Sequence, residues 1–137
     1  MVCLDGSKSS IRALRTGILF ARQSDDTIVG VHIDVSKGSS RSFSNSKIKE
    51  DNWSDEIKKI MQFARNKCNI RRVEFEGIVI GGHNAGNDLV RFANNKNNKI
   101  EQIVIGSQGT GYPKGTFFGS ISNFVLHKAN IPVTIVK

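Results

Sequence analysis

The stretch 100–122 reads IEQIVIGSQGTGYPKGTFFGSIS, and it decides the fold that we predict for this 137-residue chain. The apolar run 100–105 predicts a buried strand, and the glycines after it predict a turn out of the sheet. Gly119 and Ser120 predict the start of a helix, whose free N–H groups and positive dipole suit a phosphate. Strand end, loop and helix start together predict a phosphate-binding cradle.

The same alternation extends outward over the whole chain. Apolar runs predict four more strands at 1–4, 27–33, 73–80 and 133–136. Apolar residues at helical spacing predict helices over 9–22, after Ser54, after Asn87 as the cap of a short helix, and from Ser120 or Ser122. This order predicts an α/β fold with a five-stranded, mainly parallel sheet and four helices on both faces. Ligands of such sheets bind beyond the carboxyl ends of the strands.

The length and composition favour one domain over residues 1–137. The serine-rich segment 34–53 predicts a flexible polar loop inside that domain. No apolar stretch approaches the roughly 20 residues that span a bilayer, and the N-terminus lacks a secretory pattern, so we expect no membrane association. Two isolated cysteines do not form a disulfide framework, which fits a reducing compartment and a cytoplasmic protein.

The net charge of +8 favours an anionic partner without naming it. The basic residues are spread along the chain without interleaved aromatic residues, so we do not expect nucleic acid as the primary partner. The three histidines are too scattered for ligand spacing, and no CxxC pair exists, so we expect no metal site built by the protein.

Gly106, Gly109, Gly119 and Ser120 form a G-x2-G-x9-G-S pattern that resembles the nucleotide-binding motif of the universal stress protein family, in its ATP-binding subgroup. The N-terminal VCLDGSKSSIRAL and the C-terminal GSISNFVLHKANIPVTIV also resemble that family, so the resemblance spans essentially the whole chain. It implies a Rossmann-like domain with strand order 3-2-1-4-5.

The resemblance also implies a ligand and its site. The ligand is an adenine nucleotide, ATP or else ADP or AMP, with Mg²⁺ carried by its phosphates. Matching positions imply that Cys3, Leu4 and Ile33 line the adenine side and that Asp5 contacts the nucleoside. The residues implied around the motif loop, the ribose and the phosphates are Ile105, Gly106, Gly109, Gly119, Ser120, Ile121 and Ser122.

The implied function is that of a stress-response or signalling protein, a nucleotide-loaded switch that forms a homodimer through its last strand. No Ser–His–Asp or Cys–His arrangement follows from the spacing, and no carboxylate is placed to activate water, so we expect no catalytic residues and at most slow ATP hydrolysis. Three alternatives stay open: a slow ATP-hydrolysing enzyme, a nucleic-acid-binding module, and an ATP pyrophosphatase-like enzyme. The last rests on DGSKSS, which weakly resembles the SGGxDS loop of that group.

Overall fold

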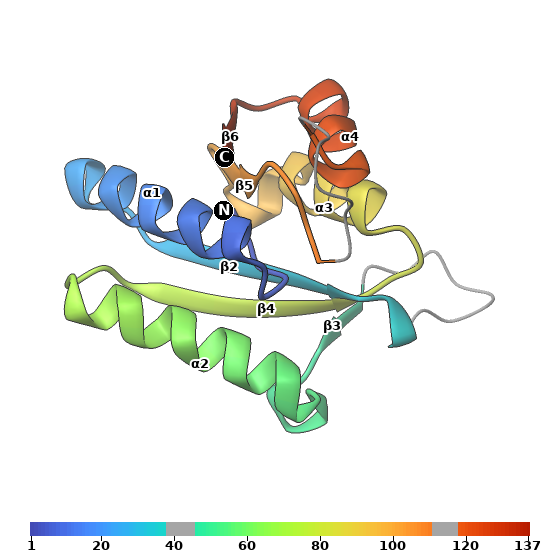
Figure 1. Ribbon diagram of the computed structural model, residues 1–137, viewed down its shortest axis with the longest axis horizontal. Coiled ribbons are helices and arrows are strands. Elements are labelled where there is room, and N and C mark those ends of the chain that lie inside the picture. The colour runs from blue at the N-terminus through green and yellow to red at the C-terminus, as the bar shows by residue number, and fades with distance from the viewer. Residues whose placement is uncertain (38–45, 111–117) are drawn as a thin grey trace.

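A computed structural model describes residues 1–37, 46–110 and 118–137 (Figure 1). The strands are β1 (Val2–Cys3), β2 (Ile28–Asp34), β3 (Ser46–Ile48), β4 (Phe75–Gly81), β5 (Ile103–Gly106) and β6 (Val133–Val136). The helices are α1 (Lys8–Ser24), α2 (Asp55–Ile70), α3 (Ala85–Asn94) and α4 (Ser120–Lys128), with 3-10 turns η1 (Val35–Lys37), η2 (Glu50–Asn52) and η3 (Lys96–Asn98). None of these helices is long and apolar enough to cross a membrane.

The strands form one sheet in the order β3-β4-β2-β1-β5-β6, and only β3 runs antiparallel to its neighbour. A single α/β domain with a mostly parallel sheet and four helices is therefore confirmed. The predicted number of five strands is wrong, because β3 adds a sixth at the edge beside β4. The predicted order 3-2-1-4-5 omits this strand and describes only β4-β2-β1-β5-β6.

β3 lies in the segment that the sequence predicted to be a polar loop. Its residues pair with β4 from Ser46 opposite Gly81 to Ile48 opposite Val79. The indole of Trp53 donates a hydrogen bond to the Ile48 carbonyl at 2.9 Å and ties the strand to the start of α2. The prediction of a flexible polar loop over 34–53 is thus wrong for Asp34, which ends β2, and for η1, β3 and η2, and its residues 38–45 lie outside the described part.

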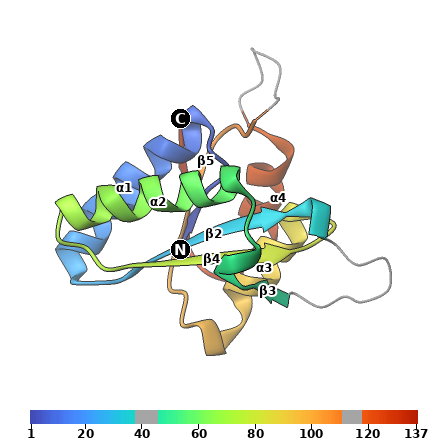
Figure 2. The ribbon, with the colours of Figure 1, turned by 90° about the horizontal axis from the view of Figure 1, so that it is seen from below.

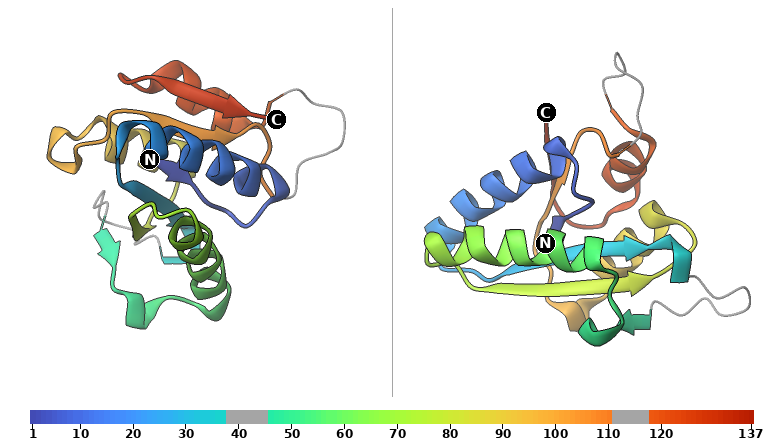
Figure 3. Two further views of the ribbon diagram at one scale, coloured as in Figure 1. Left: turned by 90° about the vertical axis from the view of Figure 1, so that its left-hand side faces the viewer. Right: turned by 60° about the horizontal axis from the view of Figure 1, so that its bottom comes forward.

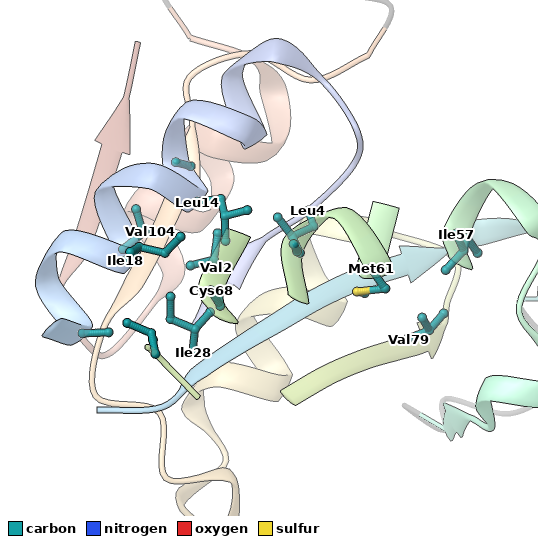
Figure 4. Packing of buried hydrophobic residues seen from close by; sticks show 14 of the residues in the cluster. Val2, Leu4, Leu14, Ile18, Ile28, Ile57, Met61, Cys68, Val79 and Val104 are labelled. Atoms are coloured by element: carbon teal, nitrogen blue, oxygen red, sulfur yellow. The ribbon is translucent and has the colours of Figure 1, made fainter. Parts of the chain in front are cut away.

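Two layers of helices cover the sheet: α1 and α2 pack on one face, and α3 and α4 on the other (Figures 2 and 3). The first layer buries Leu14 and Met61 against Val2 and Val79 (Figure 4). The second layer buries Val125 against Ile80 and Ile103. Both layers bury the apolar helix faces that the sequence spacing predicted. They hold in place the strands whose carboxyl ends carry the candidate site.

Side chains cap the first three long helices. Ser7 Oγ accepts the Ser10 N–H, Ser54 Oγ accepts the Ile57 N–H, and Asn84 Oδ1 accepts the Asn87 N–H. The prediction that Asn87 caps the third helix is wrong, because α3 begins three residues earlier and Asn87 donates to the true cap. The N-cap of α4 is Gly119, which offers no side chain to the N–H groups of the first turn.

Candidate functional site

A cleft of about 840 Å³ opens at the carboxyl ends of β1, β2 and β5. From β1 the chain first adds β2 and then β4 on one side of the sheet. It later adds β5 and β6 on the other side of β1. The order of the strands therefore reverses beside β1, which is where ligands bind in open α/β sheets. The loop after β5 and the N-terminus of α4 form part of the wall.

All eleven residues that the sequence singled out line this one cleft. They are Cys3, Leu4, Asp5, Ile33, Ile105, Gly106, Gly109, Gly119, Ser120, Ile121 and Ser122. They come from β1, β2, β5 and α4 and from the connections that follow the strands. The fold thus gathers residues that lie up to 119 positions apart in the sequence, from Cys3 to Ser122.

The floor of the cleft is apolar. Cys3, Leu4 and Ile105 are buried at the ends of β1 and β5, and Ile33 is half-buried at the end of β2. Burial raises the pKa of the Cys3 thiol to about 12, so at neutral pH this side chain is an uncharged, weakly polar group. The floor can therefore pack against a flat heterocycle without placing a charge under it.

Asp5 joins two walls of the cleft. One carboxylate oxygen accepts the Ser7 N–H at 2.9 Å, and the other accepts the Thr110 N–H at 3.1 Å. The side chain therefore holds the turn before α1 against the loop after β5. A carboxylate has about four lone-pair directions, so each oxygen can still accept a hydroxyl from a ligand.

The motif glycines differ in what they do for the fold. A Cβ on Gly106 would lie 2.6 Å from Ser9 Cβ and 2.7 Å from the Ser9 carbonyl carbon, so α1 packs directly on this backbone. A Cβ on Gly109 would lie 2.8 Å from Asp5 Oδ2. Among the described residues, a Cβ on Gly119 would meet nothing closer than 3.4 Å, the distance to Ser107 O. Of these three motif glycines, Gly106 is required by backbone packing, whereas a side chain at Gly109 would displace the Asp5 carboxylate.

One carbonyl group anchors the start of α4. The Gly119 N–H donates to Ser107 O at 2.7 Å, and Ser122 Oγ lies 2.9 Å from the same oxygen. The Ser122 hydroxyl is buried and hydrogen-bonded within the protein, so it fixes the start of the helix where the residue lines the cleft. Ser120 and Ile121 are exposed at the uncapped first turn.

Sequence reasoning missed the opposite wall. It is made by η1 and by the region around the start of α2, and its side chains include Val35, Ser36, Lys37, Trp53, Ile57 and Ile60. Helical spacing marked Ile57 and Ile60 only as core residues, and nothing in the polar segment signalled that Trp53 faces a cleft. The Gly-rich spacer 111–117 lies outside the described residues, as does Lys114 within it.

Within the described residues, no three His, Cys, Asp or Glu side chains gather as a metal site. Mg²⁺ is usually held by one or two carboxylates together with phosphate oxygens and water, and carboxylates such as Asp5 and Asp34 line this cleft. The cleft therefore fits Mg²⁺ only when a phosphorylated ligand supplies part of the coordination.

Three solved structures show the same fold with few residues unmatched. A universal stress protein from Archaeoglobus fulgidus is 27% identical, with a TM-score of 0.74, and the match covers 98% of this chain and 95% of that chain. A structure of the universal stress protein from Archaeoglobus fulgidus in complex with dAMP is 26% identical, with a TM-score of 0.71 and coverage of 98% and 94%. An Arabidopsis thaliana universal stress protein family protein with AMP bound, 21% identical with a TM-score of 0.67 and coverage of 100% and 89%, shows the fold.

A search among curated proteins finds no match. A comparison with protein families matches residues 1–137 to the universal stress protein family. The match covers every element that frames the cleft, from β1 to β6. The chain belongs to the universal stress protein family.

Proposed function

We propose that this chain is a cytoplasmic protein that binds an adenine nucleotide, ATP with Mg²⁺, in the cleft and acts as a nucleotide-loaded switch in a stress or signalling response. The observation that carries the proposal is one cavity that combines a buried apolar floor with an uncapped helix N-terminus. The apolar floor suits a heterocyclic base, and the helix N-terminus suits a negatively charged phosphate chain.

The floor suits the base. Leu4, Ile33 and Ile105 present aliphatic surface, and burying a heterocycle against it gains free energy in proportion to the area removed from water. Asp5 lies between this floor and the loop after β5, so its free lone pairs are placed for ribose hydroxyl groups.

The start of α4 suits the phosphates. Its first-turn N–H groups have no capping side chain, although the other three long helices are capped by serine or asparagine. A phosphate there would accept these N–H groups and lie at the positive end of the helix dipole. The open space at Gly119, which packing does not require, lets phosphate oxygens approach the backbone closely.

Related structures support the class of ligand. The Archaeoglobus fulgidus structure at 26% identity contains dAMP, and the Arabidopsis thaliana structure contains AMP. Both ligands are adenine nucleotides. The choice of ATP rests on the resemblance of the Gly106–Ser120 pattern to that of the ATP-binding subgroup and on the phosphate-binding chemistry of α4.

Nucleotide binding is tested by calorimetric titration and thermal melting with AMP, ADP, ATP and GTP, each with and without Mg²⁺. We expect the adenine nucleotides to raise the Tm, because a ligand that binds only the folded state stabilises it by about 2.7 kcal/mol at 100 times its Kd. ATP with Mg²⁺ should bind most tightly. Mass analysis of nucleotide released from the purified protein gives an independent measurement.

A charge placed at the start of α4 tests the position of the phosphates. Ser120→Asp should leave the Tm of the empty protein unchanged or higher, because a carboxylate is favourable at a helix N-terminus. The same carboxylate should repel phosphate and weaken ATP binding by about tenfold or more. Ser120→Asn is the matched neutral control and should bind ATP almost as the wild type does.

Two results would contradict the proposal. Millimolar adenine nucleotides that neither shift the Tm nor release heat would reject nucleotide binding. Equal ATP affinity in the wild type, Ser120→Asp and Ser120→Asn would remove α4 from the site.

We also infer a homodimer through β6. This strand ends the sheet, and all four of its residues are half-buried in the single chain. An edge strand presents backbone groups to a second copy. Sedimentation equilibrium should give a mass of twice 15.1 kDa at micromolar concentration, whereas a monomer at about 100 µM, a concentration well above the Kd of a stable dimer, would contradict the inference.

A further inference from the structure

The net charge of the chain is concentrated in one helical layer. Residues 8–24 and 55–72, which form α1, α2 and the turn after α2, contain ten basic and two acidic residues and so carry a charge of +8. The remainder contains ten basic and ten acidic residues and is neutral. Even when Asp25 and Asp26 at the end of α1 are included, the layer keeps a charge of +6.

The basic side chains of this layer point away from the core. Lys8, Arg12, Arg15 and Arg22 recur on α1 at spacings of four, three and seven residues and are exposed, whereas Leu14, one residue before Arg15, is buried. α1 contains no acidic residue. The basic residues that follow in α2 and its turn are Lys58, Lys59, Arg65, Lys67, Arg71 and Arg72, all exposed except the half-buried Arg65.

An apolar groove of about 200 Å³ runs between the two helices. Ile11 and Leu14 form its α1 wall, and Ile60 and Phe63 belong to its α2 wall. The Phe63 side chain is 40% exposed, and Ile70, two turns further along α2, is 72% exposed. Figure 3 shows both helices on the same side of the sheet, with this layer facing solvent in the right-hand view.

Basic residues stand on both rims of the groove. Lys59 lines it directly. Lys67 holds its ammonium group 5.3 Å from the centre of the Phe63 ring. Arg15 lies one helical turn after Ile11 and therefore on the same side of α1. The groove thus offers an apolar floor between two cationic rims.

We propose that this groove, which we call the α1–α2 groove, binds an acidic amphipathic helix from a partner protein. An amphipathic helix places apolar side chains at i, i+3, i+4 and i+7 into such a groove, and acidic side chains on its flanks would meet Arg15, Lys59 and Lys67. A nucleic acid would use the basic rims but not the apolar floor, and a flat membrane would not enter the concave groove.

The test uses nucleotide-free protein comprising residues 1–137 and a fluorescent synthetic peptide of about 20 residues, long enough to form an amphipathic helix. The peptide carries leucine at the i, i+3, i+4, i+7 positions and glutamate on both flanks. A scrambled peptide of equal composition is its control. We expect fluorescence anisotropy to show saturable binding of the amphipathic peptide, at least about tenfold tighter than that of the scrambled peptide, and weakening with salt.

Two double variants with the same net charge test the location. Arg15→Glu/Lys67→Glu reverses one charge on each rim, and binding should weaken about tenfold or more. Lys96→Glu/Lys128→Glu reverses two exposed charges outside the α1–α2 layer and should change the Kd less than twofold. Phe63→Ser should also weaken binding, because it removes apolar surface from the groove. A far-UV circular dichroism spectrum and a cooperative melt like those of the wild type show that the fold of each variant is intact.

Several outcomes would overturn the proposal. These are no saturable binding, equal affinity for the scrambled peptide, and equal loss in both double variants. A single-stranded RNA oligonucleotide and vesicles containing phosphatidylserine serve as competing probes. If either binds more tightly than the peptide and depends on Arg15 and Lys67, the partner class is wrong. All arms omit nucleotide, so failure here is separate from failure of the nucleotide proposal.

Discussion

A single residue, Gly106, ends β5, and the packing of α1 against it leaves no room for a side chain. Its Cβ would lie 2.6 Å from Ser9 Cβ and 2.9 Å from the Ser10 backbone nitrogen, and neither can retreat without moving α1. We expect Gly106→Ala to lower the free energy of unfolding by about 2 kcal/mol or more. Gly119→Ser, whose Cβ has room, should change it by less than about 0.5 kcal/mol. Urea denaturation compares the two, and equal losses would contradict this packing argument.

The two cysteines define a second prediction. Burial raises the pKa of Cys3 to about 12 and that of Cys68 to about 11, above the ordinary 9.0. The unfolded chain therefore loses thiol protons first, and the contribution of both groups to stability, complete below pH 9.0, is lost as the pH rises toward 11 and 12. At pH 8 iodoacetamide should modify unfolded protein and spare folded protein. Rapid labelling of folded Cys3 would refute this.

The sequence predicted residues that the structure brings together in one cleft, but it did not predict the packing role of each. The motif grouped three glycines together, whereas their surroundings differ: Gly106 meets the backbone of α1, Gly109 meets only the Asp5 carboxylate, and Gly119 has room for a Cβ among the described residues. The pattern also suggested a ligand contact for Ser122, yet its hydroxyl is engaged by Ser107 and Gly119. Such roles depend on distances between segments far apart in the chain, which spacing alone does not contain.

At the scale of elements, the start of α3 gives a test of one corrected cap. Asn84 Oδ1 accepts the Asn87 N–H at 3.0 Å, and Asp88 Oδ2 accepts the Asn84 N–H at 3.1 Å. Asn84→Ala should therefore cost about 1 kcal/mol in the free energy of unfolding. Asn87→Ala is the matched control and should cost less than about 0.5 kcal/mol, because alanine favours a helix interior. A larger loss in Asn87→Ala, measured by urea denaturation, would restore the earlier assignment of the cap.

The elements that were predictable carry their own local signal. Four strands contain clear Ile and Val runs, β1 lies in the short apolar run 1–4, and the helices bury residues at regular spacing. β3 has no such run, since its sequence is Ser-Lys-Ile, and it forms because β4 offers an edge and Trp53 fastens Ile48. The sequence did not predict the wall of the cleft that α2 contributes, for a related reason. Apolar spacing shows that Ile57 and Ile60 turn inward but not that a cavity lies there.

At the scale of the whole molecule, the concentration of charge on the α1–α2 layer predicts an unusual response to salt. Ten basic residues on one face repel each other in the folded protein more than in an extended chain. Salt screens that repulsion, so raising NaCl from about 10 to 300 mM should increase the free energy of unfolding. The variant Arg15→Glu/Lys67→Glu should show a smaller increase. A fall in stability with salt in the wild type would contradict this prediction.

The α1–α2 groove and the nucleotide cleft share three lining residues, Leu4, Ser10 and Ile60. A ligand that shifts the Ile60 side chain in one of the two cavities also changes the wall of the other cavity. Thermodynamic linkage makes any such coupling reciprocal: the factor by which nucleotide alters peptide affinity equals the factor by which peptide alters nucleotide affinity. If both proposed ligands bind, these three shared residues are where occupancy of the cleft would meet occupancy of the groove.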